Sequence, residues 1–286
     1  MLLALPFGIL GLIMGSFINV LVLRRGAKSI RGRSECMSCG ALIRWYDNIP
    51  VISWFFLRGR CRACGSSISA QYPLVELVTG ALFALVAGAA YIPPGPDAFA
   101  AVAVLLVPFA MTALLVAIAV YDLKHTVIPD GWVYTFGALA LLSALLNPYG
   151  FTIAYVLLAG PLTALPLFVL WLISKGRWMG LGDAKLALGI GWLLGPLYGV
   201  VALFLAFIIG ALVSLPLLLL SSGRGRGFLQ VFTHTEASSK LVRGVTMKSE
   251  IPFGPFLVAA CIIVWLSILY GVDLLEVLGI ILPGSL

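Results

Sequence analysis

Long runs of apolar residues limit what this chain can fold into more than any other feature of its sequence. A membrane-spanning helix needs about 20 mostly apolar residues. Of the 286 residues, 62% are hydrophobic and only 10% are charged, which is too little polar surface to solvate a compact globule. We therefore expect an all-α polytopic membrane protein with about eight transmembrane helices. The predicted spans are 3–23, 72–92, 98–121, 131–147, 152–173, 184–198, 199–220 and 255–272.

Three of these boundaries need comment. The run 184–198 is interrupted by Gly195 and Pro196, so this run and the next could form one broken element instead of two spans. The first run has no basic residue before it and no small-residue cleavage site after it, so we expect it to stay as a spanning helix. The apolar tail 274–282 is short and suits an interfacial end.

The basic residues predict the orientation. Lys and Arg are retained on the cytoplasmic side of short loops, and with the N-terminus outside all 18 of them fall in inner segments. Those segments are 24–71, 122–130, 174–185 and 221–253, with nine, one, three and five basic residues. The net charge of +7 therefore reports topology and contact with the lipid bilayer, and we expect no nucleic acid partner. We assign no chemistry to the polar loop 221–253.

The segment 24–71 reads as a small soluble insert after the first span. It holds Cys36-x2-Cys39 and Cys61-x2-Cys64, and a glycine follows each pair. Two such pairs can supply the four thiolates of a tetrahedral structural zinc site. Two disulfides or a redox pair are the alternatives, and a cytoplasmic location disfavours them. Cys261 lies in the last predicted span and is expected to be a packing residue.

Acidic residues at the membrane boundary are functional candidates, because charge near lipid is costly. Asp122 ends the third predicted span and Asp183 opens the sixth, both on the inner side. If they meet, one can hold a proton while the other accepts one from water, which permits peptide hydrolysis. Otherwise Asp183 caps a helix and Asp122 pairs with a nearby Lys or Arg. We expect Asp130 to cap a helix, and Glu76 either faces the insert or extends toward water.

Three other functions remain open from the residues alone. An ion-coupled transporter could use the two aspartates as proton or cation sites, although both lie at the inner boundary. A membrane-tethered zinc module could only bind a partner. A thiol oxidoreductase would need the cysteines outside.

Taken together, the motifs resemble those of the type IV prepilin peptidases, which are bifunctional leader peptidases and N-methyltransferases. The resemblance covers nearly the whole chain. It rests on Gly15-Ser-Phe-Ile-Asn19-Val, both cysteine pairs, Asp47-Asn-Ile-Pro, Tyr72-Pro-Leu-Val-Glu76-Leu, Asp122 with Pro129-Asp130, Gly180-x-Gly182-Asp183 with Lys185, and Ile251-Pro-Phe-Gly-Pro255.

This resemblance implies that Asp122 and Asp183 are the catalytic pair, with Gly180, Gly182 and Lys185 as supporting motif residues. The implied substrate is a prepilin or pseudopilin of pilus or type II secretion assembly, cut after its short basic leader at the inner face of a bacterial inner membrane. The family also methylates the new N-terminus with S-adenosylmethionine. The implied seat of methylation is 15–76, with Asn19, Asp47 and Glu76 as candidates. We accordingly expect a methyltransferase part, 1–95, and a peptidase part, 96–286.

Overall fold

The computed structural model describes residues 3–24, 34–89, 98–146, 152–221, 252–277 and 279, with only the backbone described for 98–105 and 217–221. Within these ranges the regular structure is helical, and strand pairing is limited to two isolated β-bridges in the insert. The long helices are α1 (Ala4–Arg24), α3 (Gln71–Ala89), α4 (Ala98–His125), α5 (Asp130–Leu145), α6 (Ile153–Ser174), α7 (Leu181–Ser221) and α10 (Gly254–Leu269). The short ones are η1 (Trp45–Asn48), α2 (Ile52–Phe56) and α11 (Leu274–Val277).

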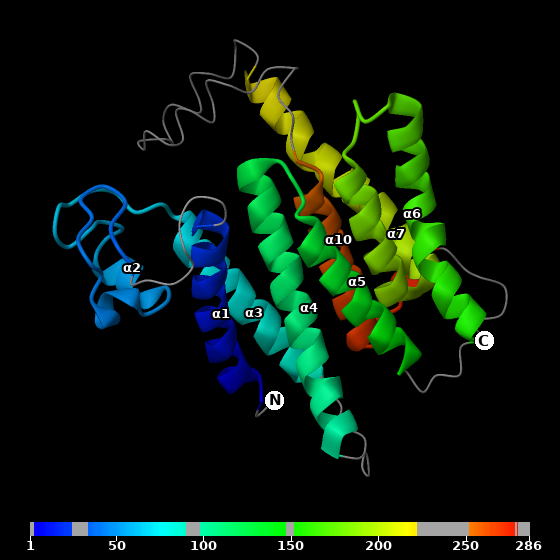
Figure 1. Ribbon diagram of the computed structural model, residues 1–286, viewed down its shortest axis with the longest axis horizontal. Coiled ribbons are helices and arrows are strands. Elements are labelled where there is room, and N and C mark those ends of the chain that lie inside the picture. The colour runs from blue at the N-terminus through cyan, green and yellow to red at the C-terminus, as the bar shows by residue number, and fades with distance from the viewer. Residues whose placement is uncertain are drawn as a thin grey trace.

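Helix α7 folds back on itself. Its 41 residues would extend about 60 Å if straight, roughly twice the hydrocarbon core of a membrane. Gly195 breaks the helix with a φ of 80° and a ψ of 170°. A Cβ atom built on Gly199 would lie 3.2 Å from the Cα of Gly191, a contact that a continuous helix cannot make. The predicted runs 184–198 and 199–220 are therefore two antiparallel limbs of one broken helix, as Figure 1 shows.

The predicted all-α membrane fold is confirmed, while the count of eight spans stays a prediction. Five described helices are long and apolar enough to cross a membrane, with α7 counted once. Helices α5 and α10 are apolar but have 16 residues each, which is short for a crossing. The five are α1, α3, the part of α4 from Leu106, α6 and α7 as far as Pro216.

Glycines on α1 let it pack closely against α3. A Cβ atom on Gly11 would lie 2.7 Å from the carbonyl oxygen of Thr79, and one on Gly15 would lie 2.6 Å from the Cα of Glu76. Small residues at such crossings let two backbones approach within a membrane. A larger core, formed by α3, α4, α5, α6, α7 and α10, includes the fully buried Phe136, Leu186 and Leu257. In Figure 1 the insert lies on the outer side of α1.

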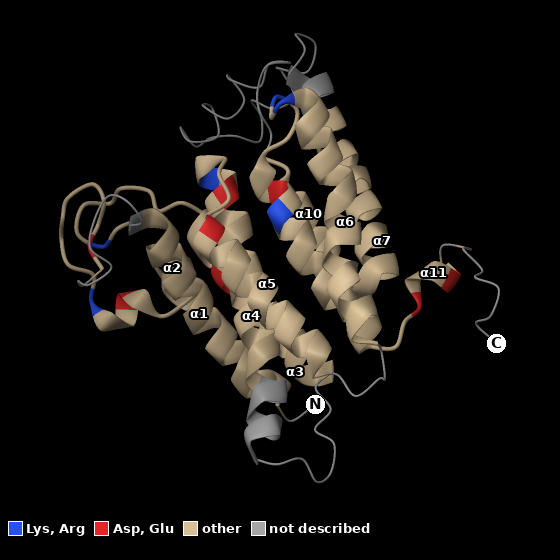
Figure 2. Cartoon of the chain, turned by 45° about the vertical axis from the view of Figure 1, so that its right-hand side comes forward, with Lys and Arg blue, Asp and Glu red and all other residues tan. Residues whose placement is uncertain are grey.

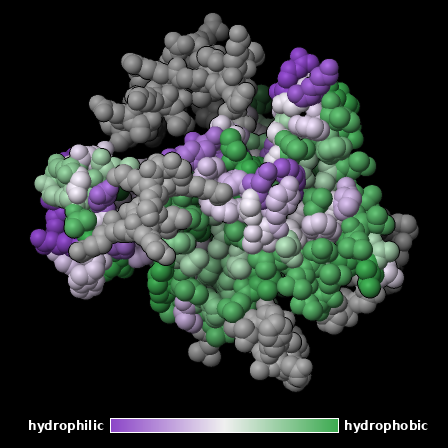
Figure 3. All heavy atoms as spheres, in the orientation of Figure 1, coloured by the Kyte–Doolittle hydropathy of each residue, from purple (hydrophilic) through white to green (hydrophobic). Residues whose placement is uncertain are grey.

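The surface is divided by polarity. In Figure 2 the charged residues gather in the insert and toward one end of the helices, apart from the acidic residues around α11. Figure 3 shows the helical flanks covered by hydrophobic residues. Residues 222–251, most of the loop predicted at 221–253, lie outside the described residues, as does most of the tail 274–282 beyond α11.

Candidate active site and metal centre

The two candidate catalytic aspartates sit at neighbouring helix ends. Asp122 lies in the last turn of α4, which runs four residues further than the predicted span, and Asp183 lies in the first turn of α7. Their residues are 4% and 7% exposed, and an electrostatic interaction links the two carboxyl groups. Two acids separated by 61 positions in the sequence are thus brought together by the fold, at the end of the helices where the sequence predicts the inner face.

Helix α10 completes this site from the C-terminal part of the chain. The backbone N–H of Gly254, the first residue of α10, donates a hydrogen bond of 3.1 Å to Oδ2 of Asp122. A Cβ atom at Gly254 would lie only 2.5 Å from that oxygen, so a side chain there would displace the carboxylate. The Ile-Pro-Phe-Gly-Pro motif carries this glycine, but the sequence alone does not reveal its contact with Asp122.

The ion-pair alternative for Asp122 finds no support among the described residues, whereas Asp183 does have a backbone hydrogen bond with Gly180 at the start of α7. Within the described part of the chain, the ion pairs join Arg62 to Asp47 and Lys185 to Asp130, so neither Asp122 nor Asp183 is paired with a Lys or Arg. Oδ1 of Asp183 is buried and has no hydrogen-bond partner among the described residues. A buried carboxylate oxygen without a partner is expensive in a purely structural role and is typical of a functional site.

The motif residues around Asp183 have different neighbours. A Cβ atom on Gly182 would lie 3.0 Å from Cβ of Ile128, so Gly182 permits close packing of α7 against the loop after α4. A Cβ atom on Gly180 would meet Oδ2 of Asp183 at 3.6 Å, so its absence leaves space next to the carboxylate. Of the two motif glycines, only Gly180 therefore leaves space beside the Asp183 carboxylate.

Lys185 does not contact the aspartate pair. Its Nζ donates a 2.8 Å hydrogen bond to Oδ1 of Asp130 and lies 5.5 Å from the ring centroid of Tyr134. The prediction that Asp130 caps helix α5 is wrong, because Pro129 occupies the N-cap position and Asp130 is the first helical residue. The ion pair instead joins the start of α7 to the start of α5.

The four cysteines form two similar turns that face each other. In each turn the glycine after the second cysteine has a positive φ, 70° at Gly40 and 71° at Gly65. Its N–H donates a 2.9 Å hydrogen bond to the carbonyl of the first cysteine, Cys36 or Cys61. Glycine adopts this left-handed conformation without a steric penalty, so each of these glycines turns the chain after its cysteine pair.

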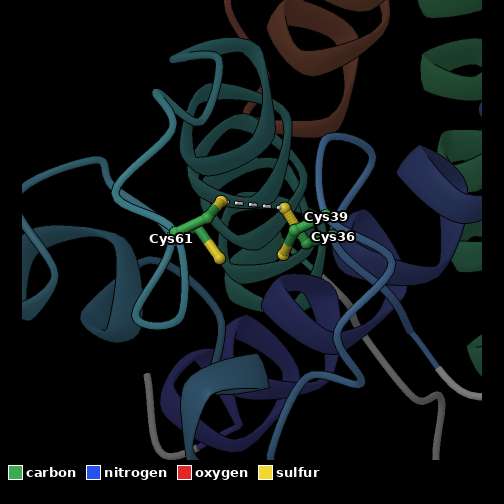
Figure 4. A group of neighbouring side chains, drawn as sticks. Cys36, Cys39 and Cys61 are labelled. Atoms are coloured by element: carbon green, nitrogen blue, oxygen red, sulfur yellow. Dashed lines mark hydrogen bonds between the residues drawn. The ribbon is translucent and has the colours of Figure 1, made fainter.

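The sulfur atoms converge on one point. Those of Cys36, Cys39, Cys61 and Cys64 lie within 4.8 Å of one another, and Figure 4 shows the three labelled cysteines pointing their sulfurs together. Tetrahedral zinc with 2.3 Å bonds places sulfurs about 3.8 Å apart. The 3.9 Å separation of the Cys36 and Cys64 sulfurs fits this value and is too long for a disulfide. All four cysteines are free thiols, so this cluster could bind a metal ion.

The surroundings favour the thiolate at Cys36 and Cys64, while at Cys39 a backbone hydrogen bond at Ala41 lowers the pKa but the neighbouring Cys64 and Cys36 raise it, to about 11. Backbone N–H groups of Cys39 and Ser38, and the hydroxyl of Ser66, lower the pKa of Cys36 to about 6. A hydrogen bond from the Ser66 hydroxyl, 3.1 Å from the sulfur, likewise lowers the pKa of Cys64. Because the thiolate is the form that binds a metal, this environment suits a metal centre.

A cavity of about 720 Å³ lies between the insert and the ends of α1 and α3. Its wall includes both cysteine turns, the polar side chains Asp47 and Glu76, and the aromatic rings of Trp54 and Tyr72. This volume is in the range of small-molecule sites in proteins. The cavity was not evident from the sequence, because it forms only when the insert packs against two helices.

Two of the three candidate residues for methyl-donor binding line this cavity. Oε2 of Glu76 accepts the N–H of Val51 at 2.7 Å, so Glu76 faces the insert. The carboxylate of Asp47 receives two hydrogen bonds from Arg62, of 2.8 and 2.6 Å, which lower its pKa. Asn19 is not part of the wall. It is 1% exposed and donates to the carbonyl of Tyr72 at 3.2 Å, joining α1 to α3.

Two family models match the chain. Residues 9–90 match the bacterial peptidase A24 N-terminal domain, and residues 109–215 match the type IV leader peptidase family. The first match includes the insert and its cysteines, and the second includes both aspartates.

Several curated proteins are similar over most of the chain. A prepilin leader peptidase/N-methyltransferase of Myxococcus xanthus is 36% identical over 225 residues, which cover 76% of this chain and 63% of that protein. Proteins of the same name from Dichelobacter nodosus and Burkholderia pseudomallei are 33% and 30% identical. These alignments cover 86% and 90% of this chain, and 74% and 85% of the relatives.

No solved structure matches the chain, and nothing in the comparisons supports the ion-coupled transporter. The similarity to these relatives agrees with the aspartate pair and the four-cysteine cluster, and the chain belongs to the type IV leader peptidase family.

Proposed function

We propose that this protein cleaves the leader from type IV prepilins or pseudopilins at the cytoplasmic face of the membrane and then N-methylates the new N-terminal residue. The observation that carries the peptidase part is the meeting of Asp122 and Asp183, two buried carboxylates without an ion-pair partner in the described part of the chain. The names of the relatives, prepilin leader peptidase/N-methyltransferase, support both activities.

In the proposed mechanism the two aspartates share one proton. Two adjacent carboxylates cannot both ionise cheaply, so one is ionised and the other protonated. The ionised one takes a proton from a water molecule whose oxygen attacks the scissile carbonyl carbon, and the other gives its proton to the amide nitrogen as the C–N bond breaks. The N–H of Gly254 holds Asp122 in orientation. The space beside Gly180 admits the substrate backbone next to Asp183. The leader, which is basic and short in this family, remains on the cytoplasmic side.

Zinc is the proposed metal of the insert, held by Cys36, Cys39, Cys61 and Cys64. It would supply a structural cross-link between two chain turns and no step of the reaction. A module of this size has little apolar core, so metal binding would contribute a large share of its folding free energy. Both turns line the cavity, so the metal would also fix the shape of the cavity wall.

The cavity fits S-adenosylmethionine in volume and in the chemistry of its wall. This cofactor supplies an electrophilic methyl group on a positively charged sulfur. The carboxylate of Glu76 can balance that charge, and the rings of Trp54 and Tyr72 offer surfaces for an adenine base. The wall includes the ends of both membrane helices α1 and α3, so a substrate N-terminus freed at the membrane surface would be within reach.

The peptidase proposal can be tested with purified protein and a prepilin in detergent. We expect Asp122→Asn and Asp183→Asn each to lower the rate of leader loss by roughly 10³-fold, the scale of losing an acid–base group. Mass spectrometry of the pilin measures both the loss of the leader and the addition of a methyl group. The matched control is Asp273→Asn, which removes a carboxylate in the segment after α10 and should cleave normally. A prepilin left intact by the unsubstituted protein would refute the proposal.

A further inference from the structure

The short helix α2 of the insert presents an apolar face that no described part of the chain covers. Ile52, Phe55 and Phe56 share one face, with spacings of three and four residues. They are 53%, 63% and 85% exposed. The opposite face is engaged, because the Ser53 hydroxyl donates to the carbonyls of Ile49 and Tyr46 at 2.8 and 2.9 Å, and Trp54 lines the cavity. Helix α2 is therefore amphipathic, with its aromatic side turned outward.

The depth of α2 relative to the membrane helices identifies what covers this face. Val51, directly before α2, donates its N–H to Glu76. Glu76 is five residues inside α3, about 8 Å from the start of that helix. It also packs against Gly15 of α1, which is nine residues and about 14 Å from the end of α1 at Arg24. Helix α2 thus begins beside the apolar parts of α1 and α3, and Figure 1 shows it next to α1.

The residues that flank α2 match the same environment. Trp45 in η1 is 79% exposed, and tryptophan is enriched where headgroups meet acyl chains. Arg58 and Arg60 follow α2 and are exposed, so they can contact lipid phosphates. An apolar aromatic face bordered by arginines is the pattern of a helix that lies in the membrane interface.

We propose that α2 is an interfacial anchor, with Ile52, Phe55 and Phe56 inserted among the lipids of the leaflet on the insert's side. The insert is then a half-immersed module and not a freely soluble one. The lipid contact holds the cavity wall against α1 and α3. This inference depends on α1 and α3 lying in a membrane and is independent of either enzymatic activity.

Photocrosslinking of the full-length protein in vesicles of phosphatidylethanolamine and phosphatidylglycerol tests the proposal. A benzophenone amino acid replaces Phe56, and in separate variants Phe55, Leu5 or Trp54. Leu5 on α1 is 73% exposed and serves as the lipid-facing reference, and Trp54 is the control on the opposite face of α2. After irradiation, intact-mass spectrometry counts protein carrying one added lipid, and metal content reports whether the insert has folded.

We expect lipid adducts at positions 56 and 55 in yields similar to position 5 and roughly tenfold above position 54, because an inserted side chain is surrounded by acyl chains. Crosslinked dimers in place of lipid adducts would show that a second copy covers the face, and would overturn the proposal. Folded variants at both Phe55 and Phe56 without lipid adducts would overturn it as well, by showing that α2 faces water.

Discussion

The two candidate sites are built in opposite ways. The aspartate site is held by close contact between helix ends, where glycines at 182 and 254 bring backbone and side chains to distances that leave no room for a Cβ atom. The insert has turns in place of helices, and its cysteines converge on one point with little apolar core around them. The first site is therefore preorganised by packing, whereas we propose that the second depends on its metal and on the contact with Glu76. Perturbations should affect the two sites separately.

Removal of the metal should produce the largest difference between the two activities. Chelation, or Cys61→Ser, should abolish N-methylation, because the turns that line the cavity lose their cross-link. Leader cleavage should fall by a much smaller factor, since Asp122 and Asp183 make no contact with the described part of the insert. Protease digestion should then cut within residues 34–70, and metal analysis would report the loss of zinc. Equal loss of both activities would show that the insert also supports the peptidase.

A side chain at Gly254 should damage only the aspartate site. Gly254→Ala places a Cβ atom 2.5 Å from Oδ2 of Asp122, and a displaced catalytic group costs about 10²-fold in rate. Cleavage kinetics measure this loss, and methylation of a pilin that already lacks its leader should stay normal. Gly131→Ala is the matched control, because a Cβ atom there has no neighbour within 4 Å. Normal cleavage by Gly254→Ala would show that the contact between Gly254 and Asp122 is not needed for catalysis.

Neutralising Glu76 should weaken only the binding of the methyl donor in the cavity. Glu76→Gln keeps the shape of the side chain but removes a negative charge that faces a positively charged methyl donor. We expect about tenfold weaker binding of S-adenosylmethionine, the scale of a single favourable charge interaction. Isothermal calorimetry measures the affinity, and the same variant should cleave leaders at the normal rate. Unchanged affinity would place the methyl donor elsewhere.

The smallest expected effect concerns the acid stability of the metal centre. The pKa of Cys36 lies at about 6, below the usual thiol value of 9.0, so its thiolate persists as the pH falls from 9 toward 6. Because zinc competes with protons for the thiolates, zinc should stay bound at pH 7 and be released only when the pH falls below about 6. Metal content after dialysis at stepped pH measures the midpoint. Ser66→Ala should raise it, since the Ser66 hydroxyl helps to lower this pKa. A midpoint above pH 8 would contradict the proposed thiolate environment.

The parts of the site that are local in sequence could be predicted. The cysteine spacing and the following glycines specify two turns without reference to the rest of the fold. The distribution of basic residues places Asp122 and Asp183 at the same membrane face, and the structure brings them together. The role of Asp130 could not be predicted in this way, because it pairs with Lys185 instead of capping α5.

Features that depend on contacts between distant segments could not be predicted. The contact between Gly254 and Asp122 joins residues 132 positions apart, and no periodic pattern encodes it. The hydrogen bond from Val51 to Glu76 sets the depth of α2 beside the membrane helices. The polar composition of 24–71 predicts only a soluble insert. The fold-back of α7 at Gly195 could not be predicted, because a Gly-Pro pair is compatible with a kink in one helix or with a turn between two.

The proposal of two separate active sites is tested most directly in a single reaction. It contains a prepilin and a pilin already lacking its leader, together with S-adenosylmethionine, and intact-mass spectrometry reads the products. We predict that the unsubstituted protein removes the leader and adds one methyl group to both mature chains. Asp183→Asn should leave the prepilin whole and still methylate the pre-cleaved pilin. Cleavage by Asp183→Asn at the normal rate would contradict the central claim that Asp122 and Asp183 form the catalytic pair.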